Sequence, residues 1–162
     1  MVMAIMVRPP LEADLAALSQ IDASYAEEHE LEPLMSAGAL RFFGRTEHSF
    51  VAHEGHRAGS VPVGFVLAQA IWSGERPQVL VARIASDGTP GASEALLKAL
   101  VKSAYDSGVY DLQTRVPPGD APLRALLKRE SFFEDPQVAY VRILGSRGVA
   151  AAQRLAGVTG RD

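Results

Sequence analysis

The sequence predicts an α+β fold whose central sheet is mostly antiparallel and includes one parallel strand pair. Three observations support this prediction. Apolar residues alternate through successive segments between residues 49 and 85, which is typical of an antiparallel meander. Helical periodicity lies on either side of these segments, and a strand pattern follows the long helix, as in a right-handed crossover. The 162 residues, 48% hydrophobic and 22% charged, indicate one soluble globular domain.

The first part of the chain predicts one strand and two helices. Residues Ala4–Arg8 form a short apolar run that ends at a Pro-Pro pair, as a first strand would. An amphipathic helix follows, and the charged stretch Glu27–Glu30 ends its pattern. A second helix is predicted from Pro33, a favourable first-turn residue, to Gly44. The apolar face of the first helix consists of Leu11, Leu15, Leu18, Ile21 and Tyr25.

The middle of the chain predicts three antiparallel strands. Alternation runs through Ser49–Glu54 and Val61–Leu67, and turn residues separate the two segments. A further turn precedes the third strand, Gln78–Ala85, which is apolar on both faces apart from Arg83. A strand that is apolar on both faces is predicted to lie at the centre of the sheet.

The second half of the chain predicts a helix, a strand, a short helix and a last strand. The long helix ends at Gly108, and a strand covers Val109–Val116. Asp120 is expected to cap the short helix, and alternation predicts a strand over Gln137–Leu144. The apolar face of the long helix consists of Leu96, Leu97, Leu100, Val101 and Ala104.

The expected domain organisation is a single domain over residues 1–145, followed by a tail or short helix over 146–162. The tail is rich in Ala and Gly, with a short helix predicted near Val149–Leu155.

Composition excludes several classes of protein. The absence of cysteine excludes disulfide frameworks, thiolate metal sites and thiol nucleophiles. A formal net charge of −3 argues against nucleic acid as the main partner. The longest apolar stretch, Val61–Trp72, is well short of the ~20 residues that span a membrane. Met1–Val7 has no preceding positive region and does not resemble a signal peptide, so we expect a cytoplasmic protein.

One segment has the features of an anion site. Residues Leu80–Ser93 run from the predicted central strand through small residues into the start of a helix. The amides and dipole at a helix N-terminus suit phosphate, although a tight strand-to-helix connection explains Gly88–Gly91 equally well. The chain has no Gly-Lys-Ser/Thr phosphate loop and no Gly-x-Gly-x-x-Gly motif, which argues against nucleotide-binding folds of those types.

Several motifs resemble those of the GNAT superfamily of acyl-CoA-dependent N-acetyltransferases. Arg83-Ile84-Ala85, with the following loop and helix, resembles motif A of the superfamily, and Val63-Gly64-Phe65 resembles the Val-Gly-Phe of its third strand. The resemblance spans about Ala4 to Leu144 in element order, and it implies helices on both faces of the sheet and a splayed parallel strand pair. The superfamily pattern Asn-x-x-Ala-x-x-Leu-Tyr-x-Lys-x-Gly-Phe is matched in register by Asp120, Leu123, Leu126, Arg129, Ser131 and Phe132.

The resemblance implies transfer of an acetyl group from acetyl-CoA to a primary amine of a small molecule or peptide by direct attack. The pantetheine arm would lie between Gln78–Ala85 and Val109–Val116, and the pyrophosphate would bind the amides of the loop. Members of the superfamily often form dimers, so the resemblance also allows a homodimer. The residues that the resemblance implies for cofactor binding are Ile84, Ala85, Ser86, Gly88, Thr89, Gly91, Ala92, Ser93 and Asp120.

The sequence also departs from the superfamily pattern. Asp87 places a negative charge in the loop, and Pro90 lacks an amide donor. Leu127 occupies the position where many members carry the tyrosine that protonates the thiolate. The alternative hypothesis is therefore a catalytically inactive GNAT-like module that binds acyl-CoA or a protein partner.

Candidates for catalysis come from residue type and position. Glu28, Glu47 and Glu75 are candidates for the base, because acidic groups beside the second helix and the meander often face the substrate in this fold. Each is equally explained as a solvated surface carboxylate. Tyr140 and Tyr110 are candidates for the acid, although packing explains both more simply.

The histidines suggest a metal site only superficially. His48, His53 and His56 lie close together in the sequence. On one strand, however, His48 and His53 would point to opposite faces, and no standard metal-binding spacing is present. We therefore expect a polar hairpin and no metal.

Overall fold

A five-stranded sheet forms the centre of the first 131 residues in the computed structural model, which describes residues 3–57, 59–148 and 153. Strands β1 to β4 pair antiparallel, and β5 pairs parallel to β4. The predicted mostly antiparallel sheet with one parallel pair is confirmed. In sheet order, the strands are β1 (Ile5–Arg8), β2 (Phe50–Glu54), β3 (Pro62–Ser73), β4 (Arg76–Ser86) and β5 (Asp111–Thr114).

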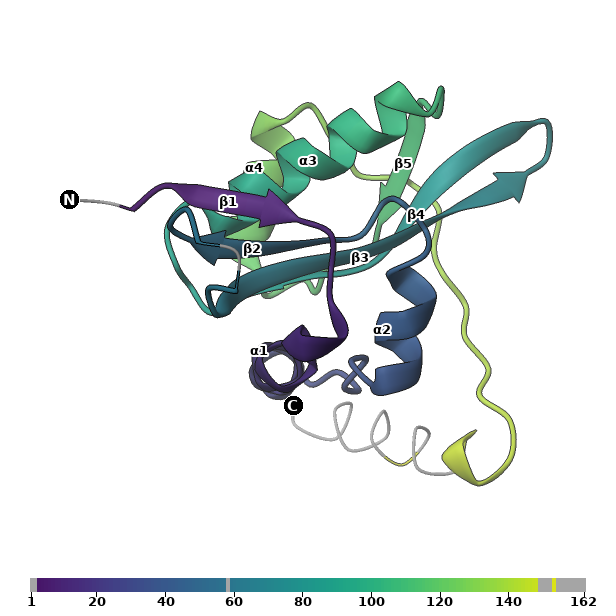
Figure 1. The fold of residues 1–162 in the computed structure, drawn as a ribbon. Helices are drawn as coiled ribbons and strands as arrows, with labels where there is room; N and C mark the ends of the chain where they lie inside the picture. The colour runs from purple at the N-terminus through teal and green to yellow at the C-terminus, as the bar shows by residue number, and fades with distance from the viewer. Residues whose placement is uncertain (1–2, 58, 149–152, 154–162) are drawn as a thin grey trace. The chain divides into compact units, whose positions relative to one another are not determined.

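Helices cover both faces of this sheet, as the sequence predicted. Figure 1 shows α1 (Leu15–Glu28) and α2 (Ala37–Phe43) on one face, and α3 (Ala92–Asp106) and α4 (Ala121–Arg129) on the other. A short 3-10 turn, η1 (Glu12–Asp14), precedes α1.

The helix boundaries follow local capping. Helix α2 begins at Ala37 rather than at Pro33, because the hydroxyl of Ser36 caps it by accepting the amide of Ala39 at 3.0 Å. Asp120 caps α4 as predicted, since its Oδ1 accepts the amide of Leu123 at 3.1 Å. Both caps satisfy amides that have no partner inside the helix.

The core has two layers. Between the sheet and the first two helices, every member of the apolar cluster is at most 8% exposed. On the other face, α3 buries Leu96, Leu97 and Leu100 to 2% exposure or less, and each buried leucine contributes about 1.5–3 kcal/mol of transfer free energy. The first cluster consists of Leu18, Ile21, Leu40, Phe43, Val51, Phe65, Leu67 and Ala85.

An extra residue in β4 marks the point where β4 and β5 separate. Leu67 pairs with Arg83 and Ala68 pairs with Val81, so Ala82 is a β-bulge without a partner on β3. A bulge bends its strand and increases the local twist. Accordingly, β5 pairs with β4 only as far as Val81, and from Ala82 to Ser86 the β4 edge has no partner in β5. The predicted splayed pair is therefore present.

A buried ion pair fixes α1 against β4. Arg83 Nη1 donates to Asp22 Oδ1 at 2.6 Å, and Asp22 is 1% exposed. Asp22 Oδ2 also accepts the amides of Leu34 and Met35, at 2.6 and 2.7 Å. The same carboxylate thus connects α1, β4 and the segment that leads into α2.

Residues from Phe132 onward belong to a second unit, which is described by itself. The strand predicted over Gln137–Leu144 is wrong: this segment is irregular in the structure. Alternation provides only the side-chain pattern of a strand, and backbone pairing is needed to form one. The helix predicted near Val149–Leu155 lies outside the described residues except for Gln153. The single domain expected over residues 1–145 stays a prediction.

Candidate functional site

A cleft of about 830 Å³ lies at the carboxyl end of β4. Its walls come from α1, from the loop Asp87–Gly91, from the first turn of α3 and from α4. Most of the residues that the resemblance implied for cofactor binding line it, and their role in binding stays a prediction. The lining includes Ile84, Ala85, Ser86, Gly88, Thr89, Gly91, Ser93 and Asp120, whereas Ala92 is fully buried at the start of α3.

A second pocket of about 320 Å³ occupies the splay between β4 and β5. Residues Ala82–Ile84 form one side of it, and Arg115–Pro118 form the other. Tyr25, Ile84 and Leu123 line both this pocket and the larger cleft. The two spaces therefore adjoin at these three side chains.

The loop between β4 and α3 is held by internal hydrogen bonds and leads into the N-terminus of α3. Gly88 and Gly91 have φ angles of +92° and +83°, which side chains rarely adopt. Asp87 Oδ1 accepts the amide and the hydroxyl of Thr89 at 2.9 and 2.6 Å, so this carboxylate is engaged within the loop. The amide of Ser93 lies in the first turn of α3, where the helix supplies no acceptor.

Helix α4 contributes a cation and a buried leucine. Arg129 lines the cleft and forms an ion pair with Glu94 of α3. Leu127 is 7% exposed, and α4 lines the cleft with Leu123, Leu126 and Arg129. At this position α4 therefore offers packing and no proton donor.

Because β5 leaves the sheet early, α1 on one face reaches the start of α4 on the other. The hydroxyl of Tyr25 donates to Asp120 Oδ2 at 2.7 Å. Burial, together with this hydrogen bond, raises the pKa of Tyr25 above its ordinary value of 10.0. Tyr25 therefore keeps its proton, and Asp120 is the acceptor of the pair.

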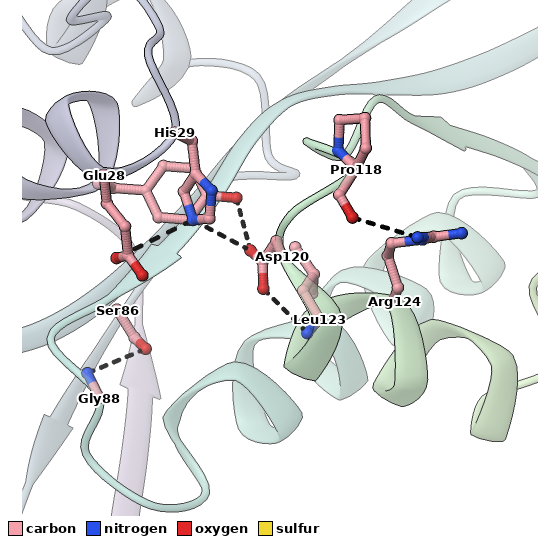
Figure 2. Close-up of polar contacts among 9 residues, drawn as sticks. Glu28, His29, Ser86, Gly88, Pro118, Asp120, Leu123 and Arg124 are labelled. Carbon is pink, nitrogen blue, oxygen red and sulfur yellow. Dashed lines mark hydrogen bonds and ion pairs between the residues drawn. The ribbon is translucent and has the colours of Figure 1, made fainter. Parts of the chain in front are cut away.

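His29 lines the cleft. Figure 2 shows its ring between the carboxylates of Glu28 and Asp120. Its Nε2 is 4.0 Å from Asp120 Oδ2 and 4.0 Å from Glu28 Oε2. The His29 side chain is 9% exposed, that of Asp120 is 12% exposed and that of Glu28 is 75% exposed. The His29 ring also packs on Tyr25, with ring centroids 4.5 Å apart.

The structure places the five predicted catalytic candidates in different parts of the chain. Tyr110 immediately precedes β5 and is 74% exposed. Glu28 lines the cleft. Glu47 is exposed in the turn before β2 with a φ of +63°, and Glu75 is exposed at the tip of the β3–β4 hairpin. At about 3.3 Å per residue, that tip is roughly 30 Å along β4 from Ile84. Tyr140 belongs to the second unit, and its residue exposure is 94%.

Sequence reasoning missed Tyr25 and His29 as site residues. Tyr25 follows the apolar face of α1 and was interpreted as core, whereas His29 lies in the charged stretch that ends the helix. Their common partner, Asp120, is far away in the sequence, 95 positions after Tyr25. The match of Asp120 to a superfamily motif was the only available signal.

The other histidines have separate surroundings. His48 Nδ1 lies 3.0 Å from Ser103 Oγ, and burial lowers the pKa of His48 below 6.5. His53 is 5% exposed, whereas His56 is exposed. Within residues 3–57, 59–148 and 153, no group of three or more acidic or histidine side chains is arranged to hold a metal ion. None of the helices in this described part of the chain is long and apolar enough to cross a membrane.

Comparisons with known proteins identify relatives in sequence and in structure. A family model described as "Protein of unknown function (DUF1999)" matches residues 8–157. Wild-type TTHA1254 from Thermus thermophilus is 44% identical, with a TM-score of 0.70 over 88% of this chain and 99% of that chain. A search of curated proteins by sequence finds no match.

Two acetyltransferase structures share the fold at lower identity. The ribosomal-protein-alanine N-acetyltransferase of Brucella melitensis biovar Abortus 2308 is 17% identical, with a TM-score of 0.65 over 88% of this chain and all (100%) of that chain. A predicted acetyltransferase with acetyl-CoA from Clostridium acetobutylicum is 13% identical, with a TM-score of 0.63 over 86% of this chain and 96% of that chain. These similarities confirm the GNAT fold that the sequence predicted.

Proposed function

The chain belongs to the DUF1999 family, and we propose that it is an N-acetyltransferase that moves an acetyl group from acetyl-CoA to a primary amine of a small molecule or peptide. The observation that carries this proposal is the splay between β4 and β5, which opens beside the loop that leads into the N-terminus of α3. The pocket in the splay adjoins the cleft that the loop lines. A long ligand with a phosphate group at one end and a narrow arm at the other suits such an arrangement.

The residues present fit acetyl-CoA in three respects. The β4 edge from Ala82 to Ser86 has no partner in β5, so its backbone is available to the amides of a pantetheine arm. The first turn of α3 offers the amide of Ser93, whereas that of Ala92 donates to Thr89 O, and a Cβ added to Gly88 would meet nothing within 4 Å, so there is room for a phosphate at this glycine. Arg129 places a guanidinium on the cleft wall, where it forms an ion pair with Glu94 in the first turn of α3. When bound, acetyl-CoA would supply an acyl group activated as a thioester.

The inactive alternative is favoured by one observation. Leu127 is buried in α4 and has no proton to give to a thiolate. A protein that binds acetyl-CoA and releases no thiol with any primary amine would therefore be a binding module. Binding and turnover must be measured separately.

The decisive experiment is calorimetric titration of the full chain with acetyl-CoA, with CoA and ATP as comparison ligands. The key variant is Ser93→Glu, which places a carboxylate in the first turn of α3. An acidic residue at this position is favourable for the helix, so the variant should fold. The matched control is Ser93→Gln, which has the same size and no charge.

We expect wild type to bind acetyl-CoA with micromolar affinity. Repulsion between the new carboxylate and the pyrophosphate should weaken binding at least tenfold in Ser93→Glu, or about 1.4 kcal/mol. Ser93→Gln should stay within about threefold of wild type. Equal affinities of the two variants for acetyl-CoA would show that the pyrophosphate does not bind at this loop. No heat with any CoA ester would refute the proposed function.

A further inference from the structure

We propose that Glu28, His29 and Asp120 form the subsite for the ammonium group of the acceptor, and that Nε2 of His29 takes its proton. This inference rests on the proposed function, because it assigns the acceptor end of the same cleft. It gives His29 a catalytic role, since Nε2 would contact the reacting nitrogen.

Nε2 of His29 and the carboxylates of Glu28 and Asp120 enclose a gap. The two carboxylate oxygens lie 4.0 Å from Nε2, beyond the ~3.2 Å limit of an ordinary N–H···O hydrogen bond. The imidazole is nevertheless almost fully buried, at 9% exposure, and it lies on the wall of the cleft. A nitrogen on the wall of the cleft, with both neighbouring carboxylates out of bonding range, is suited to a ligand that comes between them.

The charges around the gap favour a cation. Two carboxylates approach the same imidazole nitrogen, whereas two arginines of the surrounding elements are engaged with other acids. Arg83 is bound to Asp22, and Arg129 forms its ion pair with Glu94. A primary ammonium has three donors, enough for both carboxylates and for Nε2.

The subsite is held in place on both sides. Asp120 Oδ1 accepts the amide of Leu123, and its Oδ2 accepts the hydroxyl of Tyr25. His29 packs against the ring of Tyr25. Asp120 and His29 are therefore fixed before a ligand arrives, whereas the exposed Glu28 is free to close on it.

The proton balance is simple. The bound ammonium loses one proton to Nε2 of His29, which leaves a neutral amine and an imidazolium between two carboxylates. The amine nitrogen bonds to the thioester carbonyl carbon as the C–S bond breaks, and sulfur leaves with the electron pair. The nitrogen then loses a second proton to the sulfur, which gives the amide and the free thiol of CoA. The imidazolium of His29 releases its proton to water. A tyrosine at position 127 is therefore not required.

The first test observes the imidazole directly. The four histidines give four ring signals by NMR, and the signal lost in His29→Gln identifies His29. The probe is n-butylammonium chloride, with 1-butanol as its neutral counterpart, at constant pH. We expect the ammonium to move the His29 signal saturably, while the exposed His56 serves as an internal control and does not respond.

Two variants separate the contributions to the subsite. Glu28→Gln and Asp120→Asn each remove one negative charge with little change of shape, and Asn at position 120 can still cap α4. Each should weaken the response to n-butylammonium at least threefold. No movement of the His29 signal, or equal movement with 1-butanol, would overturn the proposed subsite whether or not acetyl-CoA binds.

The second test separates binding from turnover. The substrate is an amine for which wild type releases thiol from acetyl-CoA. With this amine, His29→Gln should lower kcat at least 100-fold, whereas its calorimetric Kd for acetyl-CoA should stay within threefold of the wild-type value. His56→Gln is the matched control and should behave as wild type. Wild-type turnover in His29→Gln would refute the role of His29 and leave the proposed function intact. Failure of wild type to bind acetyl-CoA would refute the proposed function instead.

Discussion

Removing one partner of the ion pair between Asp22 and Arg83 should strongly destabilise the first unit. The perturbation is Asp22→Asn, which keeps the shape of the side chain. Its single oxygen can still accept the amides of Leu34 and Met35, but its NH2 group then faces the guanidinium of Arg83. One charge-assisted hydrogen bond is lost, and a buried cation is left without its partner.

The magnitude follows from the burial of the pair. The Asp22 and Arg83 side chains are 1% and 11% exposed, so solvent screens their interaction poorly. Removing one partner of a buried pair costs about 3–5 kcal/mol. Because Asn keeps both amide contacts, we expect the low end, about 3 kcal/mol, and a fall in Tm of about 10 °C. A domain with ordinary stability of about 5–15 kcal/mol would remain folded.

The assay is urea unfolding followed by circular dichroism for wild type, Asp22→Asn, Arg83→Met and the double variant. Each single change should lower the free energy of unfolding, and the double change should cost little more than one of them. The expected coupling energy is about 2 kcal/mol. Coupling below about 0.5 kcal/mol would show that the two side chains contribute independently and would refute this reasoning.

Two further predictions concern other polar contacts and a strained turn. Burial raises the pKa of Asp14, but hydrogen bonds from Arg8 and from the amide of Leu11 outweigh this effect and lower the pKa below 3.8. The stability that these hydrogen bonds contribute is therefore present above about pH 4 and is lost as the pH falls through the lowered pKa. Asp14→Asn should therefore cost about 2 kcal/mol at pH 7 and much less near pH 2 in urea titrations, and a cost independent of pH would contradict this assignment. Ser131 has a φ of +68° at a position where the superfamily motif has glycine, so Ser131→Gly should raise the free energy of unfolding by about 0.5–1 kcal/mol; a decrease in the same measurement would show that the turn is not strained.

Local patterns in the sequence were sufficient to predict most of the fold. The meander, the long helix and the cap at Asp120 each depend on neighbouring residues, so periodicity and residue type identify them. The segment Gln137–Leu144 shows the limit of this approach, because its alternation is regular and yet no strand forms there. Strand formation depends on a partner, which a local pattern does not contain.

The site depends on contacts that local patterns cannot predict. Glu28 was identified as a candidate, but the importance of its neighbour His29 depends on Asp120, which the β4–β5 splay brings to α1. That splay begins at Ala82, and neither a glycine nor a proline marks the bulge in the sequence. The position of the cleft therefore follows from the sheet register, which is a property of the folded chain.

The bulge at Ala82 also changes which side chains of β4 face the same side of the sheet. Val81 and Arg83 are two residues apart and would share a face in a regular strand, but their partners, Ala68 and Leu67, are adjacent and face opposite sides. Arg83 therefore points toward Asp22 only because β4 accommodates Ala82 as an unpaired residue. If Ala82 instead paired regularly with Leu67, Arg83 would pair with Val66 and face the other side of the sheet, and the bend that separates β4 from β5 would be lost. The opening between β4 and β5 and the ion pair that holds α1 thus both depend on the same bulge.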